Sequence, residues 1–326
     1  MIVSGSGPRA VVTTCSYEAR AFGVGSAMPT LRARRLCPHA VLIPPDFPAY
    51  HAMSQRVMDI VREHVETVEQ LGMDEAFLDL SDLSSPKTAM RRLVADIREQ
   101  TRMAASIGIG PNRVVAKVAS DAEKPHGFVM LTREEAVERF GDHPPGLVPG
   151  IGPKTQERLL ALGLRTLDQV AAADEEALIA AFGPRQGPWL KARAAFHGSD
   201  VVTPVREAVS ESRETTFDED VRDPARMEEL LRGLATRLGE ALRKHERRGR
   251  TIAIKVRLDD FSTVTRARTI GHPTDDPQEI SDVAAQLLRD YGPERPVRLL
   301  GVRVAGFAGE DDTAAAVDTG QLALPM

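Results

Sequence analysis

Adjacent carboxylates occur in the segment Gly72–Leu80, which reads Gly-Met-Asp-Glu-Ala-Phe-Leu-Asp-Leu. Asp74 and Glu75 stand before an apolar, strand-like run, where two neighbouring negative charges are costly unless a cation holds them. Successive side chains of a strand point to opposite faces, so both carboxylates reach one ion only where the backbone turns, and Gly72 permits such a turn. The pair therefore suits a metal site, although the same residues also suit a solvated turn beside a strand.

A second polar group follows the β-rich run Arg9–Thr14. Thr14, Tyr17 and Arg20 are spaced to share one side of a turn that enters a helix. A hydroxyl, a phenol and a guanidinium suit the oxygens of a polyphosphate, because Arg presents a fork of N–H donors. Tyr and Arg at this spacing are also typical of a stack on a helix surface. Lys124 is either a further phosphate contact or a charge at a turn.

A glycine-flanked turn, Leu147–Thr155, runs into the helical stretch Gln156–Leu162. Gly150 and Gly152 allow backbone N–H groups to approach a phosphate closely, and Lys154 stands where the helix begins. The pattern indicates a helix-hairpin-helix that binds DNA backbone without reading bases, and a purely structural turn is the alternative. The tetrapeptide Gly-Ile-Gly-Pro recurs at 108–111 without a following lysine, and we interpret that copy as structural.

A basic stripe lies in a chain whose net charge is −5. Between Arg243 and Arg268 there are nine basic residues and three acidic ones. Such a stripe suits a nucleic-acid surface, although a solvated helix end and hairpin would look the same. Its members predicted to bind DNA are Arg250, Lys255, Arg257, Arg266 and Arg268.

Hydrophobic periodicity predicts three kinds of region. Short β-rich runs alternate with helices up to about residue 133, which is an α/β layer pattern. Short helices alone follow to about residue 200. From 208 to 307 the order is strand, helix, strand, strand, helix, strand, the split βαβ arrangement of ferredoxin-like domains. In its two middle strands, alternation places Lys255 and Arg257 on one face, which could contact phosphates.

Composition narrows the class of protein. The 326 residues are enough for two or more domains, and no apolar run reaches the length of a membrane span. Cys15 and Cys37 are too few for a disulfide framework or a four-ligand zinc site, and the eight histidines lack metal-ligand spacing. We expect a cytoplasmic protein with no membrane partner and no secretory signal.

Taken together, five runs in the chain resemble the Y-family (translesion) DNA polymerases, of the bacterial DNA polymerase IV type. They appear in family order and cover nearly the whole sequence; their positions are 16–29, 74–79, 116–125, 148–152 and 211–217. The resemblance implies an α/β and α+β multidomain fold with a helical thumb and a βαββαβ little finger. The implied domains are fingers at 1–46, palm at 47–133, thumb at 134–200, linker at 201–206, little finger at 207–308 and a flexible tail at 309–326.

The resemblance also implies an activity and its residues. Asp74 and Glu75 look like magnesium ligands and catalytic carboxylates, with two ions expected in the complete protein. Thr14, Tyr17, Arg20 and Lys124 look like contacts to the triphosphate of a deoxynucleoside triphosphate. The implied function is error-prone, template-directed synthesis from a primer during DNA damage tolerance and repair, carried out by a monomer on primer-template DNA.

The chain departs from the family pattern at both ends. Family members open with a strand bearing an Asp-x-Asp-like motif, which supplies a further metal ligand, and Met1–Gly5 matches the family only after that strand. We expect either a start site assigned too far downstream, or a non-catalytic DNA-binding accessory member of the family. Without that strand the palm would carry unpaired strand edges. The tail segment Gln321–Leu324 resembles a sliding-clamp peptide, with Pro325 where an aromatic residue is usual.

Overall fold

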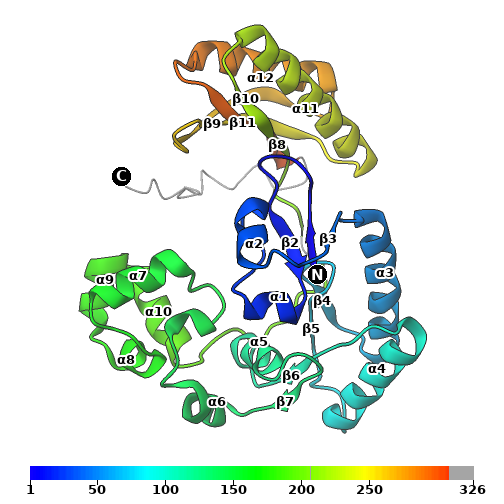
Figure 1. The fold of residues 1–326 in the computed structure, drawn as a ribbon, viewed down its shortest axis with the longest axis vertical. Coiled ribbons are helices and arrows are strands. Elements are labelled where there is room, and N and C mark those ends of the chain that lie inside the picture. Colours follow the sequence, from blue (N-terminus) through cyan, green and yellow to red (C-terminus); the bar gives the residue numbers. More distant parts are fainter. Residues whose placement is uncertain (206, 308–326) are drawn as a thin grey trace. The chain divides into compact units, whose positions relative to one another are not determined.

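The computed structural model describes residues 1–205 and 207–307 (Figure 1). The chain divides into two compact units, one made of Met1–Pro45 with Glu207–Met326 and the other of Asp46–Arg206. The predicted tail 309–326, with its proposed clamp segment Gln321–Leu324, lies outside the described residues. None of the helices described is long and apolar enough to cross a membrane.

The first 45 residues build a small three-stranded sheet of order β2-β1-β3. β1 (Ile2–Ser4) pairs antiparallel with β2 (Val12–Cys15) and parallel with β3 (Leu42–Ile43). The helices α1 (Tyr17–Ala21) and α2 (Thr30–Leu36) follow β2, and Ser16 caps α1 by accepting from the Ala19 N–H. Buried Val12, Cys15 and Ala19 belong to the core of this segment, so α1 starts from a fixed strand end.

The C-terminal sheet consists of the strands β8 (Ser210–Val221), β9 (Gly249–Leu258), β10 (Thr263–Thr274) and β11 (Val297–Phe307), in the order β10-β9-β11-β8. The helices α11 (Pro224–Lys244) and α12 (Pro277–Tyr291) lie together against one face of it (Figure 1). The predicted strand-helix-strand-strand-helix-strand order is confirmed. Its basis is the apolar stripe of α11, in which Leu231, Leu234, Leu238 and Leu242 are fully or almost fully buried.

In the other unit, two long helices and four short strands form the α/β part. The helices α3 (Phe47–His64) and α4 (Pro86–Thr101) pack together beside the antiparallel pair β4 (Val68–Gln70) and β5 (Ala76–Leu78). β6 (Ile107–Ile109) pairs in parallel with β7 (Phe128–Met130), and α5 (Arg113–Ala122) packs against both. Among the described residues these are two separate two-stranded sheets.

Close packing explains the first Gly-Ile-Gly-Pro copy. A β-carbon at Gly108 would overlap the backbone of α5 at Ala116, and one at Gly110 would lie 2.6 Å from a methyl group of Val115. Glycine is therefore needed here for contact between strand and helix. The structural interpretation of this tetrapeptide is confirmed.

The remainder of this unit is helical, as predicted. It contains α6 (Arg133–Phe140), the 3₁₀ turn Pro145–Leu147, α7 (Pro153–Ala161), α8 (Leu167–Ala172), α9 (Glu175–Phe182) and α10 (Gln186–Ala194). Short helices of this length are stabilised mainly by packing, and here they share one core with the buried valines of α5.

Candidate active site and nucleic-acid interface

The carboxylate pair lies on the turn that joins β4 to β5. The Leu71 N–H donates to the Glu75 carbonyl over 2.9 Å, which closes the turn, and both Asp74 and Glu75 are exposed. The predicted turn is present. Gly72 does not adopt a left-handed backbone conformation there. The chain changes direction over the residues between Leu71 and Glu75.

A lysine that the sequence reasoning missed lies beside this pair. Lys117 of α5 places Nζ 2.6 Å from Glu75 Oε1 and 3.2 Å from Asp121 Oδ2. Lys124 reaches the same Asp121 with Nζ 2.5 Å from Oδ1. Burial alone would lower the pKa of Lys117, but its hydrogen bond to Glu75 and the charge of Asp121 outweigh this and raise the pKa above the usual range. Glu75 is therefore held by a cation supplied by the protein itself.

The fit of magnesium to these residues rests on their donor set. Mg²⁺ is commonly bound through one or two carboxylates together with substrate phosphates. Exposed Asp74 and Glu75 meet that requirement for one ion, provided that Glu75 exchanges Lys117 for the metal. Within residues 1–205 and 207–307 no group of three or more His, Cys, Asp or Glu side chains could hold a metal by itself.

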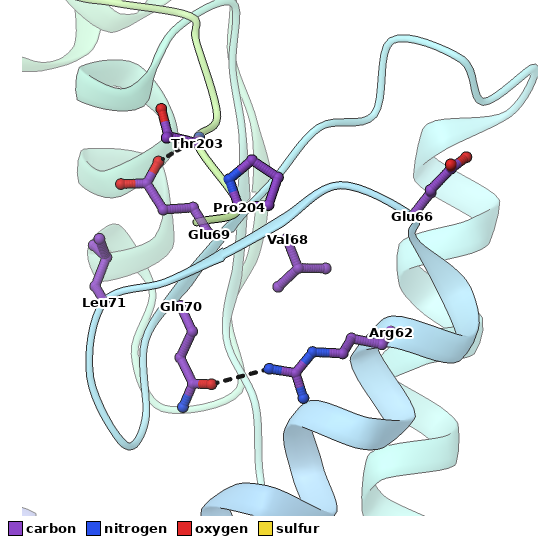
Figure 2. Close-up of a pocket in the computed structure, with 8 residues that line it drawn as sticks. All are labelled: Arg62, Glu66, Val68, Glu69, Gln70, Leu71, Thr203 and Pro204. Carbon is purple, nitrogen blue, oxygen red and sulfur yellow. Dashed lines mark hydrogen bonds between the residues drawn. The ribbon is translucent and has the colours of Figure 1, made fainter. Parts of the chain in front are cut away.

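In the pocket beside this hairpin, polar groups of the lining residues form hydrogen bonds with one another (Figure 2). It has a volume of about 360 Å³. Arg62 donates to Gln70 over 3.2 Å, and the Thr203 N–H donates to Glu69 over 2.9 Å. These contacts join the backbone at Thr203 to the hairpin and occupy polar groups that would otherwise face the pocket.

Two of the predicted triphosphate contacts, Tyr17 and Arg20, lie together on α1. The Arg20 guanidinium carbon is 5.9 Å from the centre of the Tyr17 ring, and both residues are exposed. Thr14 is exposed on β2, three residues before Tyr17. The stack expected of Tyr and Arg at this spacing is thus present, and it leaves the N–H groups of Arg20 directed to solvent or to a ligand.

The glycine hairpin, Val148–Lys154, has buried anchors and an exposed tip. Val148 and Ile151 are almost fully buried. Gly150 has φ +95°, and a β-carbon there would lie 2.7 Å from the Trp189 ring. Gly152 is the N-cap of α7 and provides no side chain for the N–H groups of the first turn. Those donors, with exposed Lys154, suit an anion at the helix N-terminus.

Strand register decides which basic residues of the C-terminal sheet share a face. Ile252, Ile254 and Val256 of β9 point into the helix-packed core, so Lys255 and Arg257 point to the opposite face. The predicted placement of these two residues is confirmed. We call the face opposite α11 and α12 the polar sheet face.

Polar contacts run across the polar sheet face. Lys255 Nζ lies 2.9 Å from Glu214 Oε2, and the pair meets over Gly301, which stands between them in the sheet. Arg257 Nε donates to Thr263 over 2.9 Å. Arg303 is exposed on this face, because it pairs in register with Ala253. The sequence reasoning missed Arg303, although alternation along β11 could have found it.

Arg266 and Arg268 lie on the other side of the sheet. They pair in register with Ile254 and Ile252, the core side of β9. The Arg266 guanidinium carbon is 5.2 Å from the Tyr291 ring centre, and Arg268 Nη2 lies 3.3 Å from Asp290 of α12. The structure therefore does not bring them together with Lys255. Arg250 is exposed one residue before the polar-face position Thr251.

Comparisons with known proteins identify relatives of the whole chain. A model of the impB/mucB/samB family matches residues 1–121, and a model of the impB/mucB/samB family C-terminal domain matches residues 208–323. The chain is 42% identical to DNA polymerase IV of Streptomyces coelicolor over 94% of its own length and 66% of that protein, just under two thirds. It is 39% identical to DNA polymerase IV of Methanoculleus marisnigri over 96% of its length and 88% of that protein.

A solved structure supports the same relationship. The Y-family DNA polymerase chimera Dbh-Dpo4(243-245)-Dbh has a TM-score of 0.83 and 25% identity to this chain. The match covers 94% of this chain and 92% of the chimera. Similarity therefore extends across both units and does not depend on a single motif.

Proposed function

This chain belongs to the impB/mucB/samB family of Y-family DNA polymerases, and we propose that it adds deoxynucleotides to a primer 3′ end in translesion synthesis. The observation that carries the proposal is the exposed pair Asp74 and Glu75 on a tight hairpin. Two neighbouring carboxylates at one turn are the kind of ligands through which Mg²⁺ is commonly bound.

The proposed roles follow from the chemistry of the side chains. Asp74 and Glu75 bind magnesium, which when present lowers the pKa of the primer hydroxyl and neutralises charge on the leaving pyrophosphate. Arg20 donates a fork of N–H groups to triphosphate oxygens, and Thr14 and Tyr17 add hydroxyl donors. Lys124 can supply a point charge to triphosphate oxygens once it leaves Asp121.

The proposed DNA contacts are sequence-independent. The backbone N–H groups of Lys154 and Thr155, together with the Lys154 side chain, bind one phosphate, and the polar sheet face binds others through Lys255, Arg257 and Arg303. Threonine hydroxyls on that face add neutral donors. Such contacts fix the position of a duplex and leave base reading to the template.

We also propose the setting in which this activity operates. Cys15 and Cys37 are both buried free thiols, which suits a reducing cytoplasm. The partners are primer-template DNA and deoxynucleoside triphosphates, and the role is DNA damage tolerance and repair by a monomer.

A second candidate function is a non-catalytic DNA-binding member of the family. It is favoured by the contact of Glu75 with Lys117 and by the lack of a third carboxylate beside the pair in the described part of the chain. A chain of this kind would hold primer-template DNA without extending it.

Primer extension by purified 1–326 separates the two functions. We expect magnesium-dependent extension that Glu75→Ala abolishes, while primer-template affinity changes less than about twofold, because Glu75 contacts no DNA phosphate in this proposal. Glu99→Ala, an exposed glutamate of α4, is the matched control and should leave extension intact. Tight DNA binding with no extension by the unmodified chain would instead count against catalysis by residues 1–326 and favour the accessory function.

A further inference from the structure

A second pocket in the Asp46–Arg206 unit has a strongly cationic wall. Its volume is about 530 Å³, and it opens beside Pro149 of the glycine hairpin. Two guanidinium groups line it, those of Arg113 and Arg193, together with Trp189 and His197. No carboxylate is among the residues that line this pocket in the described part of the chain.

Arg113 forms an ion pair with a carboxylate of the protein. Its Nη2 lies 2.8 Å from Glu69 Oε1, and its guanidinium carbon is 4.4 Å from the centre of the Phe77 ring. Glu69 is buried and accepts a second hydrogen bond from the Thr203 N–H. The charge of Arg113 is therefore balanced within the protein.

Arg193 has no such partner. Its guanidinium carbon lies 5.1 Å from the centre of the Trp189 ring. Its Nε is buried and has no hydrogen-bond acceptor among the described residues, where no carboxylate forms an ion pair with it either. Burial and the nearby charge of Arg113 both lower the pKa of Arg193. A buried donor without an acceptor is costly, and such a group commonly marks a bound water or ion.

Neighbouring elements add to the positive potential. Arg113 and Val114, the first two residues of α5, lie in the pocket wall, so the positive end of that helix dipole is near the cavity. The N–H groups of this turn donate to Asn112 and to the Ser199 carbonyl, so the helix start adds potential but no free donor. Gly198 leaves room for the guanidinium, since a β-carbon there would be 3.1 Å from Arg193 Nη1. Arginine forks match the oxygens of phosphate in geometry as well as in charge.

We propose that this pocket is a phosphate-binding site in which Arg193 is the principal ligand and Arg113 is the second. The phosphate comes either from a DNA strand held next to the glycine hairpin or from a free phosphate-containing anion. The site goes beyond the proposed polymerase function, and binding of the anion requires neither metal nor nucleotide.

The first experiment measures inorganic phosphate binding by ³¹P NMR and by the thermal midpoint, against chloride at matched ionic strength. Arg193→Met keeps the apolar stem over Trp189 and removes the donors. We expect it to weaken phosphate binding about tenfold or more. Arg158→Met is the matched control, because Arg158 also lies over an aromatic ring, Phe182, but does not line the pocket.

Thermal stability distinguishes a ligand role from a structural one. In chloride, Arg193→Met should unfold no earlier than the unmodified chain, since it removes repulsion from Arg113. Ala192→Glu places a carboxylate on the exposed rim of the pocket, and it should raise the thermal midpoint and block phosphate.

The second experiment finds the source of the phosphate. Primer-template affinity is measured against salt concentration without metal or nucleotide. If a DNA phosphate occupies the site, Arg193→Met should reduce the slope of log K against log salt by about one. An unchanged slope, with inorganic phosphate binding lost, identifies a free anion as the ligand.

The proposal is overturned if Arg193→Met changes neither phosphate binding nor the salt slope, or if it unfolds earlier in chloride and Ala192→Glu leaves phosphate binding unchanged. These readouts do not involve primer extension. A chain that failed to extend primers could therefore still bind phosphate here, and the reverse also holds.

Discussion

At the scale of single residues, charged groups of the candidate active site already form ion pairs that a ligand would have to replace. Glu75 is engaged by Lys117, and Lys124 is engaged by Asp121. Each ion pair is partly exposed to solvent, so its net contribution to stability is small and it can be exchanged for a ligand of matching charge. In the proposed function Glu75 would exchange Lys117 for magnesium, and Lys124 would exchange Asp121 for a triphosphate.

Arg20 provides a residue-scale prediction. Arg20→Ala should raise the Michaelis constant for the incoming nucleotide by about tenfold, because a charge-assisted hydrogen bond to phosphate is lost. Its effect on the maximal rate should be smaller, since the lost contact is made in the ground state as well. Steady-state single-nucleotide insertion measures both quantities.

Arg32→Ala is the matched control for that prediction, because Arg32 is exposed on α2 of the same segment. An unchanged Michaelis constant in Arg20→Ala would remove Arg20 from the triphosphate site. An equal rise in both variants would point to a general loss of positive charge instead.

At the scale of elements, the two glycines of the glycine hairpin are expected to have different roles, Gly150 in stability and Gly152 in DNA binding. Gly150→Ala should destabilise this unit by about 1–3 kcal/mol, since φ +95° is strained for alanine and the new methyl group would meet Trp189. Gly152 has φ −83° and open space around its β-carbon position. Gly152→Ala should therefore leave stability almost unchanged and weaken DNA binding, because a methyl group would hinder approach of the phosphate.

Trp189 is the only tryptophan of the chain, so its fluorescence follows unfolding of this region in urea for both variants. Fluorescence anisotropy of labelled primer-template measures the affinity. If Gly152→Ala bound DNA as tightly as the unmodified chain, the hairpin would be a structural turn.

Glu211 of β8 forms ion pairs with residues at and after the end of α11. It lies within 3.3 Å of Arg213, His245 and Arg247. Burial alone would raise the pKa of Glu211, but hydrogen bonds and charges from His245 and Arg213 outweigh this and lower it. A carboxyl with a lowered pKa stabilises the fold above its ordinary titration range, and this stabilisation disappears as the pH falls through the lowered value.

Glu211→Gln should therefore destabilise the C-terminal sheet by about 2 kcal/mol at neutral pH. The difference from the unmodified chain should shrink towards zero in acid. Amide hydrogen exchange of β11, which pairs with β8, measures this at each pH. Glu219→Gln, an exposed position on the same strand, is the control and should show no such dependence.

At the scale of the whole molecule, an acidic chain presents a locally basic surface. The net charge is −5, yet the polar sheet face carries Lys255, Arg257 and Arg303, of which Lys255 is paired with Glu214. Counterion release at such a face is set by the local charges rather than by the overall sum. Binding to DNA is therefore compatible with the acidic composition.

Charge removal on this face tests that account. Lys255→Ala and Arg303→Ala should each weaken primer-template binding for any sequence and reduce the salt slope by about one. Arg289→Ala is the control, because Arg289 belongs to α12 and is engaged by Glu228. Equal losses in all three variants would show that the face has no special role.

The order and type of the main helices and strands, and the motifs that mark the family, can be predicted from the amino-acid sequence alone. The apolar stripe of α11 and the alternation in β9 are local patterns, and helix and strand periods follow from backbone geometry alone. For the same reason, the sequence predicts that Lys255 and Arg257 lie on the face of β9 opposite to its core residues. The turn at Asp74 and Glu75 could be predicted because adjacent charges and a strand start are features of a few consecutive residues.

Contacts between residues far apart in the sequence become visible only in the folded chain. Arg266 and Arg268 belong to the same basic stripe as Lys255, but strand pairing places them on the helix side of the sheet. Lys117 contacts Glu75, although the two are 42 positions apart in the sequence. Arg193 and Arg113 line the same pocket. Such meetings depend on register and on packing between elements. A local pattern carries no information on either, because each is set by the fit of whole surfaces.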